Sequence, residues 1–224
     1  MPPGKRSNPL ALAVLVCLAE RPMHPYEVAH TLRTRHKDES VRLNYGSLYA
    51  VVEALVRRGL IEAAETERSG RLPERTIYRI TDAGLTEMHD WLAELLTVPA
   101  KEYPAFEAAL SFLSALSPEE AVSLLHERVE RLEAELAGAG ALRELVEKAQ
   151  LPRLFWVEAE FAVALRQAEL DFARRLVADI EAGTLEGMAW WREIHEHPER
   201  PVPLPQPWGD DGGAEHRHDE EESP

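Results

Sequence analysis

Apolar residues recur at helical spacing along most of the chain, and the pattern changes to alternation in one region only. The helical segments predicted in the first half are 9–20, 25–35, 45–58 and about 81–96. Two strand-like segments, 62–67 and 74–80, separate the last two helices. In the second strand Thr76, Tyr78 and Ile80 are expected on one face, with Ile77 and Arg79 on the other.

The second half is predicted to be entirely helical. Ser117-Pro118-Glu119-Glu120 is a capping box with proline at the first helical position. The residues that follow at coiled-coil spacing are Leu125, Val129, Leu132 and Leu136, a seam of about two heptads before Gly138 and Gly140 weaken it. After Pro152 one more helix is expected to carry on one side Phe155, Phe161, Leu165, Ala168, Phe172, Leu176 and Ile180. A last helical segment covers 185–196.

The segment 45–59 is the most informative part of the chain. It predicts a short helix with one apolar stripe (Leu48, Val51, Val52 and Leu55), closed by Gly59. Two strands joined by the basic tip 68–73 follow, which is the layout of a winged helix-turn-helix. The fold class predicted is therefore mainly α, with an N-terminal winged helix-turn-helix that has a two-stranded wing, plus a C-terminal helical dimerisation domain. The domains expected are 1–97 for DNA binding, 98–197 as the helical dimerisation domain, and 198–224 as a disordered acidic, proline-rich tail.

The charge distribution matters more than the net charge of -15. Residues 1–90 hold 13 Lys and Arg against 12 Asp and Glu, whereas residues 91–224 hold 12 against 28. The acidity therefore belongs to the second half, and a basic surface in the first half can still meet phosphates.

Other sequence features bear on whether the protein is secreted or bound to a membrane. Cys17 is the one cysteine, so no disulfide forms within the chain, which suits a cytoplasmic location. The apolar run 10–19 behind Lys5 and Arg6 is predicted to be a buried first helix capped by Asn8 and Pro9, and its alternative is a secretory signal. The run is too short to span a bilayer, and no membrane partner is expected.

An enzyme is disfavoured because the chain lacks a phosphate-binding glycine loop, a nucleophile elbow and a helical zinc-protease motif. No catalytic residue, metal or other cofactor is predicted. His216 and His218 beside acidic residues are assigned to a flexible tail, with a weak metal site as the alternative.

Four motifs carry a resemblance to a known family. They are Pro22-Met23-His24-Pro25-Tyr26-Glu27, Tyr45-Gly46-Ser47-Leu48-Tyr49, Gly59-Leu60-Ile61, and the segment from Glu74 to Gly84. In order and spacing they closely resemble the PadR family of dimeric winged-helix regulators, over about residues 9–92. Residues 103–187 are similar to the larger helical C-terminal domain of one branch of that family. The resemblance implies repression as the usual outcome, a homodimer formed through C-terminal helices on an inverted-repeat operator in double-stranded DNA, and release by a small molecule or stress signal.

The chain departs from the family pattern at three positions. Pro25 stands where glycine is common, Ser47 where threonine is common, and Ala50 where proline is common. Serine keeps the hydroxyl of threonine, but alanine constrains the start of the recognition helix less than proline does.

The DNA-binding candidates follow from the expected geometry, because a recognition helix presents its N-terminal residues to bases and phosphates. At that end stand Asn44, Tyr45, Ser47 and Tyr49, and the alternative for either tyrosine is packing beneath the helix. The resemblance places Tyr49 against the DNA backbone. The wing supplies the remaining candidates, Arg68, Ser69, Gly70, Arg71 and Arg75. Arg58 is a candidate phosphate contact, with a helix C-terminal charge as the alternative.

An effector site is expected among the aromatic residues of the second half. The candidates are Trp156, Phe161 and Trp190, with interhelical packing as the alternative. One rival function remains besides the regulator: a winged helix that binds protein rather than DNA.

Overall fold

The computed structural model describes residues 8–67 and 75–199, and the chain divides into two compact units. The N-terminal unit is Met1–Glu102 and the C-terminal unit is Tyr103–Pro224. Among the described residues the secondary structure is helical apart from one two-stranded sheet, so the predicted fold class is confirmed. The predicted tail falls almost entirely on residues 200–224, outside the described residues.

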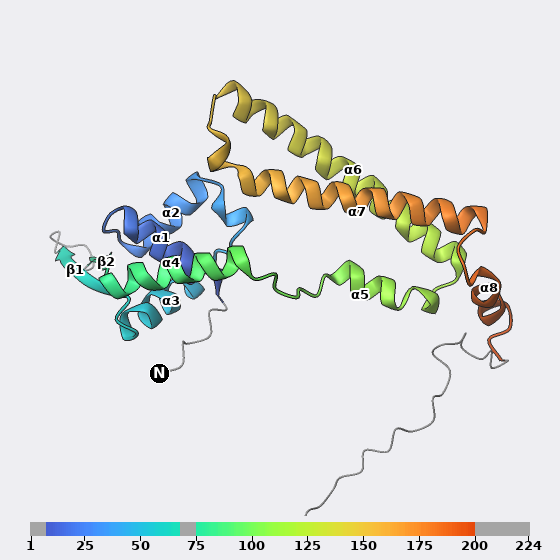
Figure 1. Cartoon of the computed structure of the whole chain (residues 1–224), viewed down its shortest axis with the longest axis horizontal. Coiled ribbons are helices and arrows are strands. Elements are labelled where there is room, and N and C mark those ends of the chain that lie inside the picture. Colours follow the sequence, from blue (N-terminus) through green and yellow to red (C-terminus); the bar gives the residue numbers. More distant parts are fainter. Residues whose placement is uncertain (1–7, 68–74, 200–224) are drawn as a thin grey trace, which may run out of the picture. The chain divides into compact units, whose positions relative to one another are not determined.

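Three helices build the helix-turn-helix core of the N-terminal unit (Figure 1). They are α1 (Pro9–Glu20), α2 (Pro25–Thr34) and α3 (Tyr45–Arg57), with a short 3-10 turn η1 (Lys37–Glu39) in the segment before α3. The Asn8 side chain accepts from the backbone N–H of Leu10 at 3.1 Å, and proline follows as the first helical residue. The predicted start of α1 is thereby confirmed, and its apolar run lies in the core.

The α2 helix begins with a reciprocal cap. The His24 side chain accepts from a backbone N–H of the first turn, and the Glu27 carboxylate accepts from the His24 backbone N–H at 3.0 Å. Proline occupies the first helical position at Pro25, where its missing N–H costs nothing. The start of α2 is therefore defined by hydrogen bonds within the sequence 24–27.

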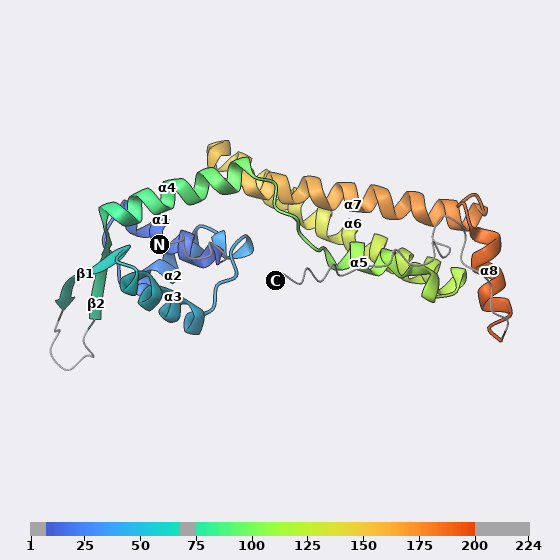
Figure 2. The same cartoon turned by 60° about the horizontal axis from the view of Figure 1, so that its bottom comes forward.

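The wing is an antiparallel pair, β1 (Ile61–Glu67) and β2 (Arg75–Ile80) (Figure 2). Ile61 pairs with Ile80 and Glu67 with Arg75, with a bulge between Ala63 and Glu65. A bridge from Met23 extends the ladder, because Met23 and Tyr78 exchange two backbone hydrogen bonds of 3.0 Å. Tyr78 and Ile80 pack against the core, as the predicted alternation requires. The base of the wing is thus bound to the segment that leads into α2.

The α4 helix (Asp82–Thr97) returns from the wing across the core, and it approaches the chain closely at one glycine. Thr81 caps this helix by accepting from the Gly84 backbone N–H at 3.1 Å, as predicted. A Cβ on Gly84 would lie 2.1 Å from the Leu60 carbonyl oxygen and 2.7 Å from Ile80 Cγ1. Any side chain here would have to push the backbone of the wing away from α4.

Two long helices dominate the C-terminal unit: α6 (Pro118–Lys148) and α7 (Val157–Ala182), which lie side by side in Figures 1 and 2. The predicted capping box of α6 is present, with Glu120 accepting from the Ser117 backbone N–H at 3.0 Å. The predicted seam is confirmed at Leu125 and Leu132, which are buried. The helix nevertheless continues through Gly138 and Gly140 to Lys148, because α-helical φ and ψ are open to glycine at a modest entropic cost.

Shorter elements complete this unit. They are α5 (Ala105–Ser111), the 3-10 turns η2 (Leu113–Ala115) and η3 (Arg153–Phe155), and α8 (Met188–Glu196). α5 lies in the half of the chain predicted to be helical, but its seven residues are too few to show a helical period that would mark its bounds. The start predicted for the last helix, residue 185, is three residues early.

The single apolar side predicted for the helix after Pro152 is wrong. Leu170, Ala173, Val177 and Ile180 form the buried face of α7. Phe161, Leu165 and Phe172 lie on a different face and are 65%, 56% and 42% exposed. The reason is geometric, since α6 and its neighbours cover one side of α7. The second stripe stays largely exposed, although Phe172 meets the Phe106 ring edge to face with centroids 6.4 Å apart.

We predict that Gly84→Ala lowers the free energy of unfolding by about 3 kcal/mol, since the added methyl meets a backbone oxygen that no rotamer change can move. Gly138→Ala in α6 is the matched control, because a Cβ there has nothing within 4 Å. That variant should be up to about 1 kcal/mol more stable than the native chain. Urea denaturation followed by circular dichroism measures both, and equal effects of the two substitutions would contradict the close approach.

Candidate nucleic-acid interface

The α3 helix separates its apolar and polar positions sharply. Leu48 and Leu55 are 0% and 1% exposed, and Val51 and Val52 are also buried, so the predicted core stripe is confirmed. Tyr45 and Tyr49 are 39% and 46% exposed, and Ser47 is exposed as well. The alternative that one of the tyrosines packs beneath the helix does not hold. The N-terminal half of α3 therefore presents two phenols and a hydroxyl to the outside.

Asn44 begins the helix. Its side-chain oxygen accepts from the Gly46 backbone N–H at 2.9 Å, which satisfies one of the donors left open at a helix start. With the oxygen engaged in the cap, the side-chain NH₂ is the group left to donate outward. The capping role fixes the position of that donor next to Tyr45.

Tyr45 contacts two residues of α2 that the sequence analysis did not select as candidates. Its ring stacks on Tyr26, with centroids 6.3 Å apart and planes 11° apart. Its hydroxyl accepts from Arg33 Nη1 at 2.5 Å. Tyr26 is 59% exposed. The helical period of α2 shows which of its residues share a face. It does not show that the Tyr45 ring of α3 would stack on Tyr26.

Tyr49 lines a cleft beside the recognition helix. The other residues that line it are Arg21, Pro22, His24, Tyr26, Glu27 and Ile77. The cleft has a volume of about 670 Å³ and brings together the start of α2, α3 and the second wing strand. Tyr26 and Tyr49 thus belong to one continuous surface with Tyr45.

The wing candidates are described only in part. Arg68, Ser69, Gly70 and Arg71 lie outside the described residues. Arg75 is the first residue of β2, paired with Glu67, and its side chain lies outside the described part. Their DNA contacts remain predictions.

Arg58 lies at the far end of α3 from Tyr45, about 20 Å away along the helix axis. Its guanidinium pairs with the Glu87 carboxylate on α4 at 2.9 Å, and the Glu87 side chain is only 13% exposed. This geometry favours the alternative role for Arg58, a charge at the C-terminal end of α3 that also ties the helix to α4.

The geometry at Cys17 gives no support to a nucleophile. The thiol is buried in the core, and burial raises its pKa to about 11, so the thiolate is scarce at neutral pH.

Within residues 8–67 and 75–199 no group of His, Cys, Asp and Glu is arranged to hold a metal ion, and His216 and His218 lie outside these ranges. None of the described helices is long and apolar enough to cross a membrane.

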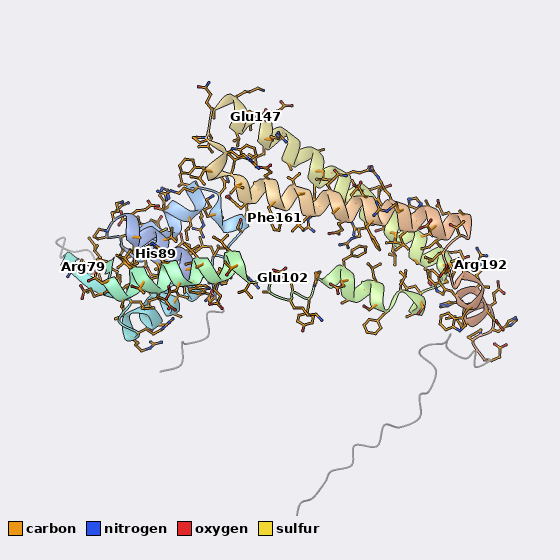
Figure 3. All side chains as sticks on the ribbon, viewed as in Figure 1. Arg79, His89, Glu102, Glu147, Phe161 and Arg192 are labelled. Carbon is orange, nitrogen blue, oxygen red and sulfur yellow. The ribbon has the colours of Figure 1, made fainter. Side chains whose placement is uncertain are left out.

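The predicted effector residues do not share one pocket. Trp156 immediately precedes α7 and Trp190 follows it in α8, while α7 itself is 26 residues, about 39 Å, long. Phe161 projects from the N-terminal part of α7 (Figure 3). Trp190 packs against the small core formed with Trp191, which is the interhelical alternative. The sequence pattern did not reveal the distance between Trp156 and Trp190, because that distance depends on the length of α7, which rises 1.5 Å per residue.

The C-terminal unit instead has a cavity of about 400 Å³ between α5, α6 and α7. Its apolar wall includes Phe106, Leu110, Leu113, Leu116, Leu125 and Leu132. Its polar wall is Arg128, Arg131, Glu135, Arg166 and Glu169. The Arg128 guanidinium lies 3.8 Å from the centroid of the Phe106 ring and pairs with Glu169. An apolar cavity with a charged rim suits a small amphipathic molecule.

The N-terminal unit matches a known protein family. Residues 14–90 match the family described as "Transcriptional regulator PadR-like family". Residues 14–90 therefore form a PadR-like domain. The resemblance stated from the four motifs is thereby confirmed for the N-terminal unit.

The relatives agree with this assignment. The negative transcriptional regulator PadR of Bacillus subtilis is 28% identical over 107 residues, which are 47% of this chain and 58% of that protein. The crystal structure of Bacillus subtilis PadR in complex with operator DNA has a TM-score of 0.63 at 21% identity, covering 77% of this chain and 99% of that one. The same regulator in complex with p-coumaric acid also has a TM-score of 0.63, at 20% identity, covering 77% and 98%. At such identities the structural matches show a shared fold.

Proposed function

We propose that the chain is a sequence-specific DNA-binding transcriptional repressor that acts as a homodimer and is released by a small molecule. In this proposal residues 1–97 bind DNA, 98–197 dimerise and respond to the effector, and 198–224 form an acidic tail. The observation that carries it is the N-terminal half of α3, where Tyr45, Ser47 and Tyr49 are exposed while the opposite face is buried in a PadR-like domain. The negative regulation and the operator complex of the Bacillus subtilis relative support repression.

The chemistry at the α3 N-terminus suits DNA. Hydroxyl and amide groups donate to phosphate oxygens, and the helix N-terminal amides add a field that favours anions. The Asn44 amide, the Ser47 hydroxyl and the Tyr49 phenol are the donors exposed at this end. A helix in the major groove would bring them to base edges and backbone together. Such work takes place in the compartment that holds the DNA, which is the cytoplasm in a bacterial cell.

Dimerisation follows from the second stripe of α7. Phe161, Leu165 and Phe172 are spaced four and seven residues apart, the spacing of a helix-packing seam, and their exposure leaves apolar area that a second copy can bury. A two-fold dimer places two recognition helices roughly 34 Å, or a multiple of one DNA turn, apart on an inverted repeat. Two half-sites supply the specificity that one helix lacks.

The test of the DNA-binding proposal is fluorescence anisotropy of the purified protein with labelled DNA from upstream of its own gene. We expect binding that unrelated competitor DNA does not displace and that weakens with salt, since phosphate neutralisation releases counterions. If the operator lies elsewhere in the genome, selection of bound fragments from a pool of random DNA sequences would identify it. If neither experiment recovers a preferred sequence at low salt, the rival reading, a winged helix that binds protein, replaces this one.

Replacing the stripe should separate the subunits. We expect the double variant Phe161→Asp, Leu165→Asp to sediment as a monomer and to bind the operator at least about tenfold more weakly, because one half-site is lost. Ala178→Glu is the control: it adds a charge to an exposed position of the same helix outside the stripe. Analytical ultracentrifugation decides, and a double variant that remains dimeric would refute the stripe as the interface.

The cavity between α5, α6 and α7 is the proposed effector site, in place of Trp156, Phe161 and Trp190. Arg128, Arg131 and Arg166 stand on its rim, so the carboxylate of an amphipathic acid would find guanidinium donors there. The Bacillus subtilis relative in complex with p-coumaric acid makes that compound a suitable first probe. Trp191 reports on the cavity, because its indole N–H donates to the carbonyl of the lining residue Leu116 at 2.7 Å.

We therefore predict a saturable change in tryptophan fluorescence with an aromatic acid, together with loss of operator binding. Arg128→Gln should weaken the response, because it removes a charge from the rim. Arg143→Gln, an exposed arginine of α6 outside the cavity that pairs with Glu147, should leave it unchanged. Flat titrations across a series of aromatic acids, or equal effects of the two substitutions, would rule out this site.

A further inference from the structure

Arg33 holds the first residue of the recognition helix from a neighbouring helix. It is the second-to-last residue of α2, and its guanidinium both donates to the Tyr45 hydroxyl at 2.5 Å and lies 4.6 Å from the centroid of the Tyr45 ring. Tyr26, two turns earlier on α2, stacks on the same ring. Three side chains from two helices thus form one exposed cluster at the start of α3.

The charge of Arg33 is the unusual feature of this cluster. Most arginines with described side chains in the N-terminal unit are neutralised by a carboxylate. The pairs are Arg21–Glu27, Arg35–Glu20, Arg57–Glu53, Arg58–Glu87 and Arg79–Glu62. Among the same described side chains no carboxylate pairs with Arg33 or with Arg42. Arg33 contacts a neutral phenol instead, so its positive charge remains uncompensated at an exposed position.

The donors of the cluster converge in a way that suits an anion. A guanidinium has five N–H donors, and only one of those of Arg33 is engaged by Tyr45. The Tyr45 oxygen accepts that bond, so its own hydrogen is free to be donated elsewhere, and accepting a bond from a cation strengthens it as a donor. In a helix-turn-helix the first helix crosses the DNA backbone while the second enters the groove, so phosphates pass the place where α2 meets the start of α3.

We infer that Arg33 and the Tyr45 hydroxyl together bind one backbone phosphate of the operator, with Tyr26 holding the Tyr45 ring in place. The inference rests on the proposed DNA-binding function and adds a contact from α2 to it. Arg33 supplies the charge and two donors in fork geometry, which match a phosphodiester. Tyr45 acts as a donor to the same phosphate and positions the guanidinium, so base reading is left to other exposed residues of α3 such as Ser47.

The test compares two arginines that lie two residues apart. Arg33→Gln and Arg35→Gln change the net charge of the protein equally, but Arg35 is held by both oxygens of Glu20, at 2.5 and 2.8 Å. Operator affinity is measured for each full-length variant by anisotropy at several salt concentrations. We expect Arg33→Gln to bind about tenfold more weakly at low salt. Its plot of log K against log salt should be shallower by about 0.9, the contribution of one phosphate contact. Arg35→Gln should keep the native slope.

Two further variants test the Tyr45 hydroxyl and the fork geometry of Arg33. Tyr45→Phe keeps the ring on Tyr26 but removes the hydroxyl, and its effect should vanish in the Arg33→Gln background if the two groups serve one phosphate. Arg33→Lys keeps the charge and most of the slope while it loses the fork. Thermal unfolding of every variant shows whether the domain stays folded.

The outcomes separate the inference from the function on which it rests. A native protein with no preferred DNA would overturn the proposed function. A native protein that binds its operator, with an unchanged salt slope in Arg33→Gln, would overturn the inference alone. A loss of affinity that tracks a lower melting temperature without a change in slope would also overturn it, because the cluster would then serve only to pack α2 against α3.

Discussion

The burial of one face of α3 is the constraint on which the other features of the N-terminal unit depend. Leu48, Val51, Val52 and Leu55 are all buried, and each apolar side chain taken from water contributes roughly 1.5–3 kcal/mol. Tyr49 lies about 100° around the helix from Leu48, so a rotation that buried its ring would bring part of this stripe to the surface. The same packing that stabilises the domain therefore leaves Tyr45, Ser47 and Tyr49 facing outward.

The wing and α4 are tied to that core by contacts of a different kind. The bridge between Met23 and Tyr78 joins the wing to the start of α2, and the absence of a side chain at Gly84 lets α4 pass against the Leu60 carbonyl. The ion pair between Arg58 and Glu87 links the end of α3 to α4. These contacts hold the recognition helix and the base of the wing in one frame, so both can be presented to a rigid duplex together.

In the C-terminal unit, α7 carries apolar residues on two different faces. One face of α7 packs on α6 through Leu170, Ala173, Val177 and Ile180, and a second apolar face is left for another partner. Charged residues at the crossing of α5, α6 and α7 surround a cavity, where Arg128 lies over Phe106 and pairs with Glu169. A molecule bound there would contact α6 and α7 at once, and α7 carries the exposed stripe that is proposed to hold the dimer together.

The sequence by itself determined the elements whose signals are local. The caps at Asn8, Thr81 and Ser117, the core stripe of α3 and the alternation in β2 follow from hydrogen bonding and periodicity within a few residues. The recognition helix and its tyrosines could be named for the same reason. Tertiary structure alone decided which residues meet across elements: that Tyr26 stacks on Tyr45, that Arg33 has a phenol as its partner, and that Arg58 is engaged by Glu87. It also divided the apolar residues of α7 between two faces and separated Trp156 from Trp190 by the length of a helix. A period states which side chains share a face, but the partner of that face depends on how distant segments pack, and no local pattern encodes that packing.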